Sequence, residues 1–249
     1  MENYLLILII FIAFLIGRIV SYSIFSVSRK GNIFAKFNCN CGKKVNILNY
    51  RCFVCKFKTY DFSFVCEILH IFFYIYIFYF FDEKFIYKIL ILILFSLLMI
   101  ITGVDIKIME IPFTINVIIF IIGILKTLLD IYYNSFNLKG ILIEHFLGML
   151  SITSLLLLVD YLTKGQGIGG GDIKLMFSAG LYLGVYNIVF SFIFACLFAI
   201  IGHFIVTFFS KKKENMLPFG PYLSLAIILF AIKGDIIVSW YVSTFMKFE

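Results

Sequence analysis

The feature that most constrains the fold of this chain is a series of long apolar segments that recurs along nearly all of its 249 residues. A helix needs about 20 mostly apolar residues to cross a bilayer. The segments that qualify are 4–27, 62–81, 85–104, 112–130, 141–162, 173–209 and 217–232 or slightly beyond. The stretch 173–209 is too long for one helix, and Gly180, Gly184 and Asn187 favour a break near 184–188. The sequence therefore predicts an all-α polytopic membrane protein with about eight transmembrane helices, of which the sixth is the shortest.

The composition excludes several other classes of protein. Hydrophobic residues make up 63% of the chain and charged residues 14%, whereas soluble domains average about 45–50% and about 25%. A chain of this kind cannot bury its apolar surface in one small core, so a lipid bilayer must cover the rest. We expect neither a disordered protein nor a nucleic-acid-binding one, and we interpret the net charge of +7 as a topology signal.

The longest polar insert divides the chain into a first transmembrane helix over 1–27, a Cys-rich cytoplasmic loop over 28–61 and a transmembrane domain over 62–249. The first helix lacks a positively charged start and a small-residue cleavage site, so we expect it to be retained. Lys and Arg residues are concentrated in the insert and in the loops on the same side, which are 105–111, 163–172 and 210–216. Positive charge favours the cytoplasmic side, so these loops are predicted to be cytoplasmic and both termini to lie outside.

Two aspartates fall in these cytoplasmic loops, at the membrane edge. Asp105 follows an apolar run at the end of the third span, and Pro112, seven residues later, opens the fourth. Asp172 starts the sixth span after a run in which five of the seven residues 165–171 are glycine. Two carboxylates that lie close together cannot both ionise easily, so one stays protonated as an acid while the other activates water. The pair therefore predicts aspartic peptide hydrolysis.

Each of these features also has an alternative interpretation. Asp172 could be a plain helix N-cap, and Asp105 a loop or snorkelling residue. The glycine run could be a flexible linker, but a phosphate-binding loop would need Gly-Lys-Ser/Thr at its end. Asp160 is a second candidate partner, although no unusual backbone surrounds it. A transporter or channel with an aspartate pair is the alternative from another functional class, but the chain shows no repeated half.

At these residues the chain resembles the type IV prepilin peptidases. Gly169-Gly-Gly171-Asp172-Ile-Lys174 fits the Gly-x-Gly-Asp-x-Lys motif of that family, Asp105 followed by Ile111-Pro112 fits its other signature, and Pro218-Phe-Gly-Pro221 is similar to the segment before its last span. The resemblance implies that Asp105 and Asp172 are catalytic, that Gly169 to Gly171 admit the substrate backbone, and that Lys174 tunes the aspartates or holds a carbonyl. It implies no cofactor for peptide cleavage.

The resemblance also implies the substrates and the location of the protein. The substrates would be type IV prepilin or pseudopilin-like proteins of pilus or secretion systems, each with a short basic leader that is cleaved after a glycine at the membrane edge. The protein would be a multi-pass protein of the bacterial cytoplasmic (inner) membrane, with its active site facing the cytoplasm.

Four cysteines in the 28–61 loop have metal-ligand spacing. Stable disulfides are disfavoured in the cytoplasm, and a Cys-x-Cys pair followed by a Cys-x-x-Cys pair predicts a structural zinc site of four thiolates. The ligands would be Cys39, Cys41, Cys52 and Cys55. The alternative is a set of unrelated surface thiols. Cys66 and Cys196 lie in spans and are expected to be packing residues.

In the resembled family a Cys-bearing N-terminal region accompanies a second activity, S-adenosylmethionine-dependent methylation of the new N-terminus. Glu67 is the candidate to face the cationic cofactor or the amine, and the alternative is that it pairs with Arg18 across two helices. The chain departs from the family pattern in its shorter Cys loop and in Ser21, which stands where many members have Asn. The three histidines are interpreted as packed or interhelical hydrogen-bonding residues.

Overall fold

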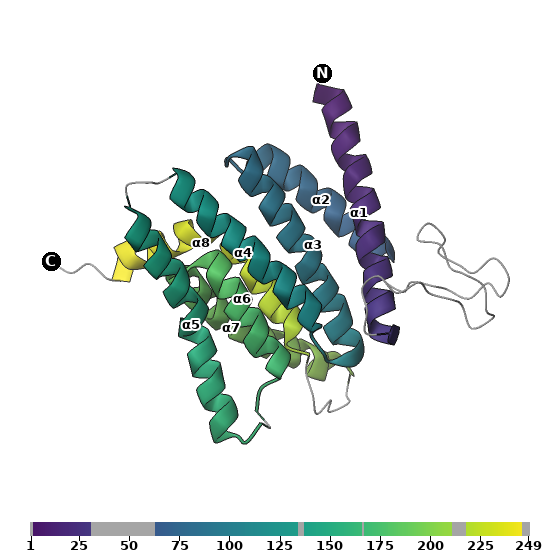
Figure 1. Cartoon of the computed structure of the whole chain (residues 1–249). Coiled ribbons are helices and arrows are strands. Elements are labelled where there is room, and N and C mark those ends of the chain that lie inside the picture. The colour runs from purple at the N-terminus through teal and green to yellow at the C-terminus, as the bar shows by residue number, and fades with distance from the viewer. Residues whose placement is uncertain (1, 31–62, 134–136, 166, 211–217, 246–249) are drawn as a thin grey trace. The chain divides into compact units, whose positions relative to one another are not determined.

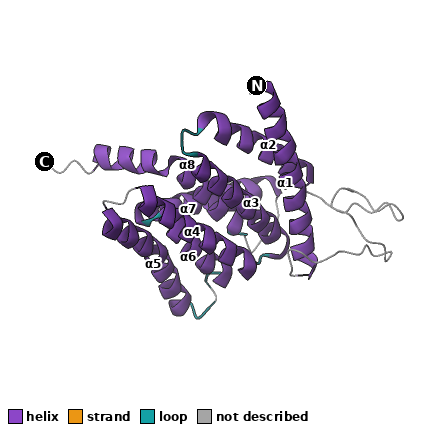
Figure 2. Cartoon of the chain, turned by 45° about the horizontal axis from the view of Figure 1, so that its top comes forward, coloured by secondary structure: helices purple, strands orange, loops and turns teal. Residues whose placement is uncertain are grey.

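The computed structural model describes residues 2–30, 63–133, 137–165, 167–210 and 218–245 (Figure 1). Within these ranges the regular structure consists of helices, as Figure 2 shows. The helices are α1 (Glu2–Lys30), α2 (Ser63–Phe80), α3 (Phe85–Ile108), α4 (Phe113–Tyr133), α5 (Leu138–Leu162), α6 (Gly170–Leu183), α7 (Val185–Ser210) and α8 (Gly220–Phe245). The predicted order of apolar segments is therefore confirmed, including the separation of the sixth from the seventh.

Seven of these eight helices are long and apolar enough to cross a membrane. The exception is α6, which has only 14 residues, fewer than the roughly 20 that span a bilayer. The chain is an all-α polytopic membrane protein, as the sequence predicts, but its sixth helix is shorter than a full span.

The break between α6 and α7 lies at Gly184. This residue has φ +80°, a conformation that costs glycine little because it has no Cβ. Its N–H donates a hydrogen bond of 3.0 Å to the Gly180 carbonyl oxygen, which satisfies one of the carbonyl groups that a helix end leaves unpaired. The expected break near 184–188 is thus confirmed.

The chain forms two compact units, Met1–Ile108 and Met109–Glu249. In the first unit α1 packs against both α2 and α3. The two helices α1 and α2 approach closely at Gly17, where an added Cβ would lie 2.8 Å from Glu67 Cα. The predicted boundaries at 27/28 and 61/62 enclose a segment that falls almost wholly outside the described residues, so this division stays a prediction.

In the second unit α6 packs against all four other helices, α4, α5, α7 and α8. Its residues Leu175, Met176 and Ala179 are fully buried. A helix with neighbours on every side buries its apolar surface against protein. It therefore does not need the length of a helix that spans the bilayer in contact with lipid. The central position of α6 therefore explains how a short element with a charged residue in its first turn sits among transmembrane helices.

Candidate active site

Asp172 lies in the first turn of α6. The N-cap position belongs to Gly169, whose carbonyl oxygen accepts hydrogen bonds from the Asp172 N–H at 3.0 Å and the Ile173 N–H at 3.4 Å. The alternative that Asp172 is itself the N-cap is therefore wrong. The positive end of the helix dipole still favours the ionised carboxylate at this position, and the residue is only partly buried.

The glycines before Asp172 make room for particular neighbours. An added Cβ at Gly169 would lie 3.1 Å from Asp172 Oδ2, so this carboxylate folds back over the start of its own helix. An added Cβ at Gly171 would lie 2.8 Å from Ile111 Cβ and 3.3 Å from Ile111 N. The segment that precedes α4 thus approaches α6 as closely as glycine allows, and the Ile111-Pro112 motif touches the motif that holds Asp172.

Pro112 lies directly before α4 and opens it, as the sequence predicts. Its carbonyl oxygen accepts the first hydrogen bonds of the helix, from the Ile115 N–H at 3.1 Å and the Asn116 N–H at 3.5 Å. A proline suits this position because its own nitrogen would make no helical hydrogen bond. The start of α4 is therefore where the sequence placed it.

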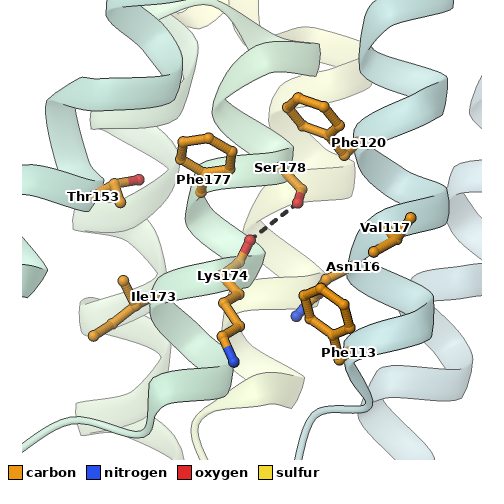
Figure 3. A pocket seen from close by; sticks show the side chains of 9 residues that line it. All are labelled: Phe113, Asn116, Val117, Phe120, Thr153, Ile173, Lys174, Phe177 and Ser178. Atoms are coloured by element: carbon orange, nitrogen blue, oxygen red, sulfur yellow. Dashed lines mark hydrogen bonds between the residues drawn. The ribbon is translucent and has the colours of Figure 1, made fainter.

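Lys174 follows Asp172 by two residues and lies at the edge of a cavity of about 360 Å³ between α4, α5 and α6 (Figure 3). Its ammonium nitrogen is 5.3 Å from the centre of the Phe113 ring, within the range of a cation–π contact. Figure 3 shows Lys174 and Phe113 at one end of the cavity and the rings of Phe120 and Phe177 at the other.

A polar residue that the sequence analysis missed is in the wall of this cavity. Asn116 is 2% exposed, and among the described residues neither its amide nitrogen nor its amide oxygen has a hydrogen-bond partner. The signal in the sequence was a single amide within an otherwise apolar segment. Buried amides are normally paired, because leaving one unpaired costs about 1–3 kcal/mol.

Asp105 lies in the last turn of α3, which continues to Ile108 and therefore includes residues expected in a hairpin loop. It is 5% exposed, so the alternative that it is a loop or snorkelling residue is wrong. The same end of α3 packs tightly on α1, because an added Cβ at Gly103 would lie 2.5 Å from Ile24 Cδ1. Asp105 belongs to the first unit and Asp172 to the second, and the pairing of their carboxylates stays a prediction.

Glu67 forms a buried ion pair with Arg18. The alternative interpretation of Glu67, pairing across two helices, is therefore confirmed. The Nε–Oε1 distance is 2.7 Å, and the two side chains are 10% and 5% exposed. The neighbouring Gly17 allows the backbones of α1 and α2 to approach at this point. Burying two charges is tolerable only when they pair closely, so this ion pair holds the two helices in one register.

Two of the histidines make the packed or hydrogen-bonded contacts that were expected. His70 lies within hydrogen-bond distance of the Cys66 carbonyl oxygen, 2.7 Å from Nδ1, and packs on Phe95. His145 joins three helices, because its ring nitrogens lie 2.7 Å from the Leu181 carbonyl oxygen and 3.2 Å from Asp130 Oδ2.

The cysteines predicted to bind zinc, Cys39, Cys41, Cys52 and Cys55, lie outside the described residues. Within the described ranges, no three His, Cys, Asp or Glu side chains gather closely enough to hold a metal ion. The zinc site therefore stays a prediction about the 28–61 segment.

The fold and this arrangement define a polytopic α-helical membrane protein with a carboxylate at the start of a buried, glycine-preceded helix. Residues 92–204 match the model of the type IV leader peptidase family. The matched range contains Asp105, Ile111-Pro112 and the whole Gly-x-Gly-Asp-x-Lys motif. The match over residues 92–204 confirms the resemblance to this family that was stated from the sequence.

Curated relatives agree with this assignment. The chain is 32% identical over 100 residues to a prepilin leader peptidase/N-methyltransferase of Aeromonas salmonicida (strain A449), a match that covers 40% of this chain and 34% of the relative. Proteins described in the same words match from Aeromonas hydrophila, at 30% identity over 100 residues, and from Legionella pneumophila, at 31% over 80 residues. The matches thus cover about a third of the length of these relatives. No solved structure matches the chain.

Proposed function

We propose that this protein is a membrane aspartic endopeptidase that removes the short basic leader of type IV prepilin-like or pseudopilin-like proteins. The observation that carries the proposal is the contact between two motifs, in which Ile111 rests on the backbone of Gly171, next to Asp172. Asp105 precedes Ile111 by six residues. This contact holds Ile111 against the start of α6, the helix that carries Asp172.

The proposed chemistry uses one ionised and one protonated carboxylate. The ionised carboxylate takes a proton from water, and the water oxygen bonds to the carbonyl carbon of the scissile peptide. The protonated carboxyl group donates its proton to the carbonyl oxygen, and the C–N bond then breaks as the leaving amine gains a proton. In this proposal Asp105 and Asp172 together form the acid/base pair.

The remaining site residues have supporting roles in this proposal. Gly169 and Gly171 leave the start of α6 without side chains, so that a peptide backbone can approach Asp172. Lys174 supplies a positive charge that can hold a substrate carbonyl group. The site faces the cytoplasm of a bacterial inner membrane, because the basic loops share that side, and the substrates would serve a pilus or secretion system.

The proposal is tested with purified protein in proteoliposomes and a synthetic substrate that has a basic leader, a glycine junction and an apolar helix. Mass spectrometry of the products should show one cut directly after the glycine. Cleavage should persist in the presence of a metal chelator, because the two carboxylates need no ion to activate water. A substrate that stays intact would refute the assignment, and an uncoupled proton flux in the same vesicles would favour a channel or transporter.

Methylation of the new N-terminus by S-adenosylmethionine is a second proposed activity, supported by the names of the curated relatives. The ion pair with Arg18 already neutralises Glu67, so a sulfonium or amine could use this carboxylate only by competing with the guanidinium. We expect Glu67→Gln to reduce methylation more than cleavage. An unmodified N-terminus on the mature substrate of the wild-type protein would show that it is a peptidase only.

A further inference from the structure

The cavity between α4, α5 and α6 has no role in the chemistry described so far, and it opens on an exposed side of the second unit. Phe113 and Val117, which line it on the α4 side, are 63% and 39% exposed. The helix α4 is long and apolar enough to cross a membrane. The exposed side of such a helix faces the hydrocarbon of the bilayer, so the cavity opens toward lipid.

The cavity lies at the depth of one leaflet. Phe113 begins α4 and Phe120 follows seven residues later, which is about 10.5 Å along a helix axis. The hydrocarbon of one leaflet is about 15 Å thick. Lys174 and Phe113 lie at one end of the cavity, near the starts of α6 and α4, and the rings of Phe120 and Phe177 lie at the other (Figure 3). The cavity therefore runs from the membrane surface, at Lys174, into the hydrocarbon.

The exposed wall of the cavity does not suit water. The Ser178 and Thr153 hydroxyls donate hydrogen bonds to carbonyl oxygens of their own helices, and both amide atoms of Asn116 are buried away from the cavity. An ordered water needs about two to four polar partners. The wall offers aromatic and aliphatic carbon instead, including the stacked rings of Phe120 and Phe177, whose centres are 5.6 Å apart. A hydrocarbon chain matches this wall.

A positive charge lies at the surface end of the cavity. The Lys174 ammonium nitrogen is 5.3 Å from the centre of the Phe113 ring, and among the described residues it takes part in no ion pair. Bilayer chains are as apolar as the cavity, so an uncharged lipid gains little by entering it. A preference for one lipid must come from the headgroup, and a lysine at the membrane surface attracts an anionic one.

We propose that this cavity is a binding site for one anionic phospholipid. One acyl chain lies along Phe120 and Phe177, and the phosphate pairs with the Lys174 ammonium group, which the Phe113 ring holds at the end of the cavity. The site does not depend on the proposed peptidase chemistry and shares only Lys174 with it. Because Lys174 follows Asp172 by two residues, a bound lipid places its headgroup at the helix end that carries Asp172.

The test uses the full chain in phosphatidylcholine proteoliposomes that contain a trace of photoreactive lipid. The photoreactive lipid carries a diazirine in one acyl chain, and it is phosphatidylglycerol in one arm and phosphatidylcholine in the other. After irradiation and mass spectrometry, phosphatidylglycerol should label residues 113–120 and 173–178 about fivefold more than phosphatidylcholine, the ratio that one lysine gives an anionic headgroup. Equal labelling of these segments by the two lipids would overturn the proposal.

Two pairs of variants separate the charge from the cavity. Lys174→Gln should reduce the labelling ratio to about one, whereas Lys164→Gln, which removes an exposed lysine outside the cavity wall, should leave it unchanged. Val117→Trp fills the opening and should reduce labelling of residues 173–178 by both lipids, whereas Leu128→Trp, at an exposed position further along α4, should not. A ratio that persists in Lys174→Gln, or labelling that is unchanged in Val117→Trp, would contradict the site.

Thermal unfolding gives a second readout that needs no cross-link. A ligand that binds only the folded protein stabilises it, so phosphatidylglycerol added to mixed micelles should raise the unfolding midpoint of the wild-type protein more than phosphatidylcholine does. This difference should shrink in Lys174→Gln and persist in Lys164→Gln. If Lys174→Gln does not fold, the two lipids compared on the wild-type protein still decide the matter, because equal midpoints would overturn the site. Neither readout involves leader cleavage, so failure here would leave the peptidase assignment standing.

Discussion

The contact between Gly171 and Ile111 predicts opposite effects for two adjacent glycines. An added Cβ at Gly171 would lie 2.8 Å from Ile111 Cβ and 3.3 Å from the Ile111 backbone nitrogen, whereas an added Cβ at Gly170 would meet no atom within 4 Å. Both residues are in the first turn of α6. Gly171→Ala should therefore destabilise the protein, and Gly170→Ala should not.

The size of the effect follows from the distances. Carbon atoms in contact prefer about 3.5–4.0 Å, so Gly171→Ala forces the segment before α4 to move by roughly 0.7–1.2 Å. Overpacking of this kind costs about 1–3 kcal/mol. Either substitution also gains up to about 0.5–1 kcal/mol from replacing glycine in a helix. The difference in unfolding free energy between the two variants should thus be about 1–3 kcal/mol, or roughly 5- to 150-fold in the folding equilibrium.

The assay is reversible unfolding of both variants in mixed micelles, together with leader cleavage in proteoliposomes. A shift of about 1 Å next to a catalytic group can reduce a rate about 100-fold, so Gly171→Ala should also lose most of its cleavage activity. Unfolding free energies that agree within about 0.5 kcal/mol would refute the claim that glycine is needed here for close approach.

Three further predictions concern the rest of the chain. Glu67→Gln should destabilise the first unit by about 3–5 kcal/mol, because it removes one partner of a buried ion pair, and adding Arg18→Met should restore most of the loss in a double-mutant cycle. Gly148→Ala should cost about 1–3 kcal/mol of unfolding free energy, since the new Cβ would lie 2.5 Å from a backbone carbonyl oxygen of α6, and an unchanged denaturation midpoint would contradict this. Anaerobically purified protein should contain about one zinc per chain, and Cys52→Ser with Cys55→Ser should release it, as metal analysis would show.

Much of this fold could be predicted from apolar segments alone, because a transmembrane helix needs a minimum length whatever its neighbours are. The break at Gly184 was also predictable, because glycine readily adopts the positive φ with which this helix ends. The sequence could not show that α6 is too short to cross a bilayer. Its burial depends on four neighbouring helices, and neighbours are not visible in a local pattern.

The candidate site, like the fold, could be predicted from the sequence only in part. The two aspartates could be selected because charge at the membrane edge is costly and therefore conspicuous in the sequence. The contact of Gly171 with Ile111 and the unpaired amide of Asn116 depend on tertiary packing, which the spacing of residues does not encode. From the sequence alone two roles were open for Glu67, and only the 2.7 Å distance to Arg18 establishes that the ion pair exists.

The measurement that tests the central claim most directly is leader cleavage by three aspartate variants in the same proteoliposomes. Asp105→Asn and Asp172→Asn should each reduce cleavage by several orders of magnitude while the protein stays folded, because an amide can neither activate water nor serve as the acid. Asp160→Asn, which changes a partly buried carboxylate near the end of α5, should keep most of the activity. Substantial cleavage by either of the first two variants, or an equal loss in the third, would contradict the assignment of Asp105 and Asp172 as the catalytic pair.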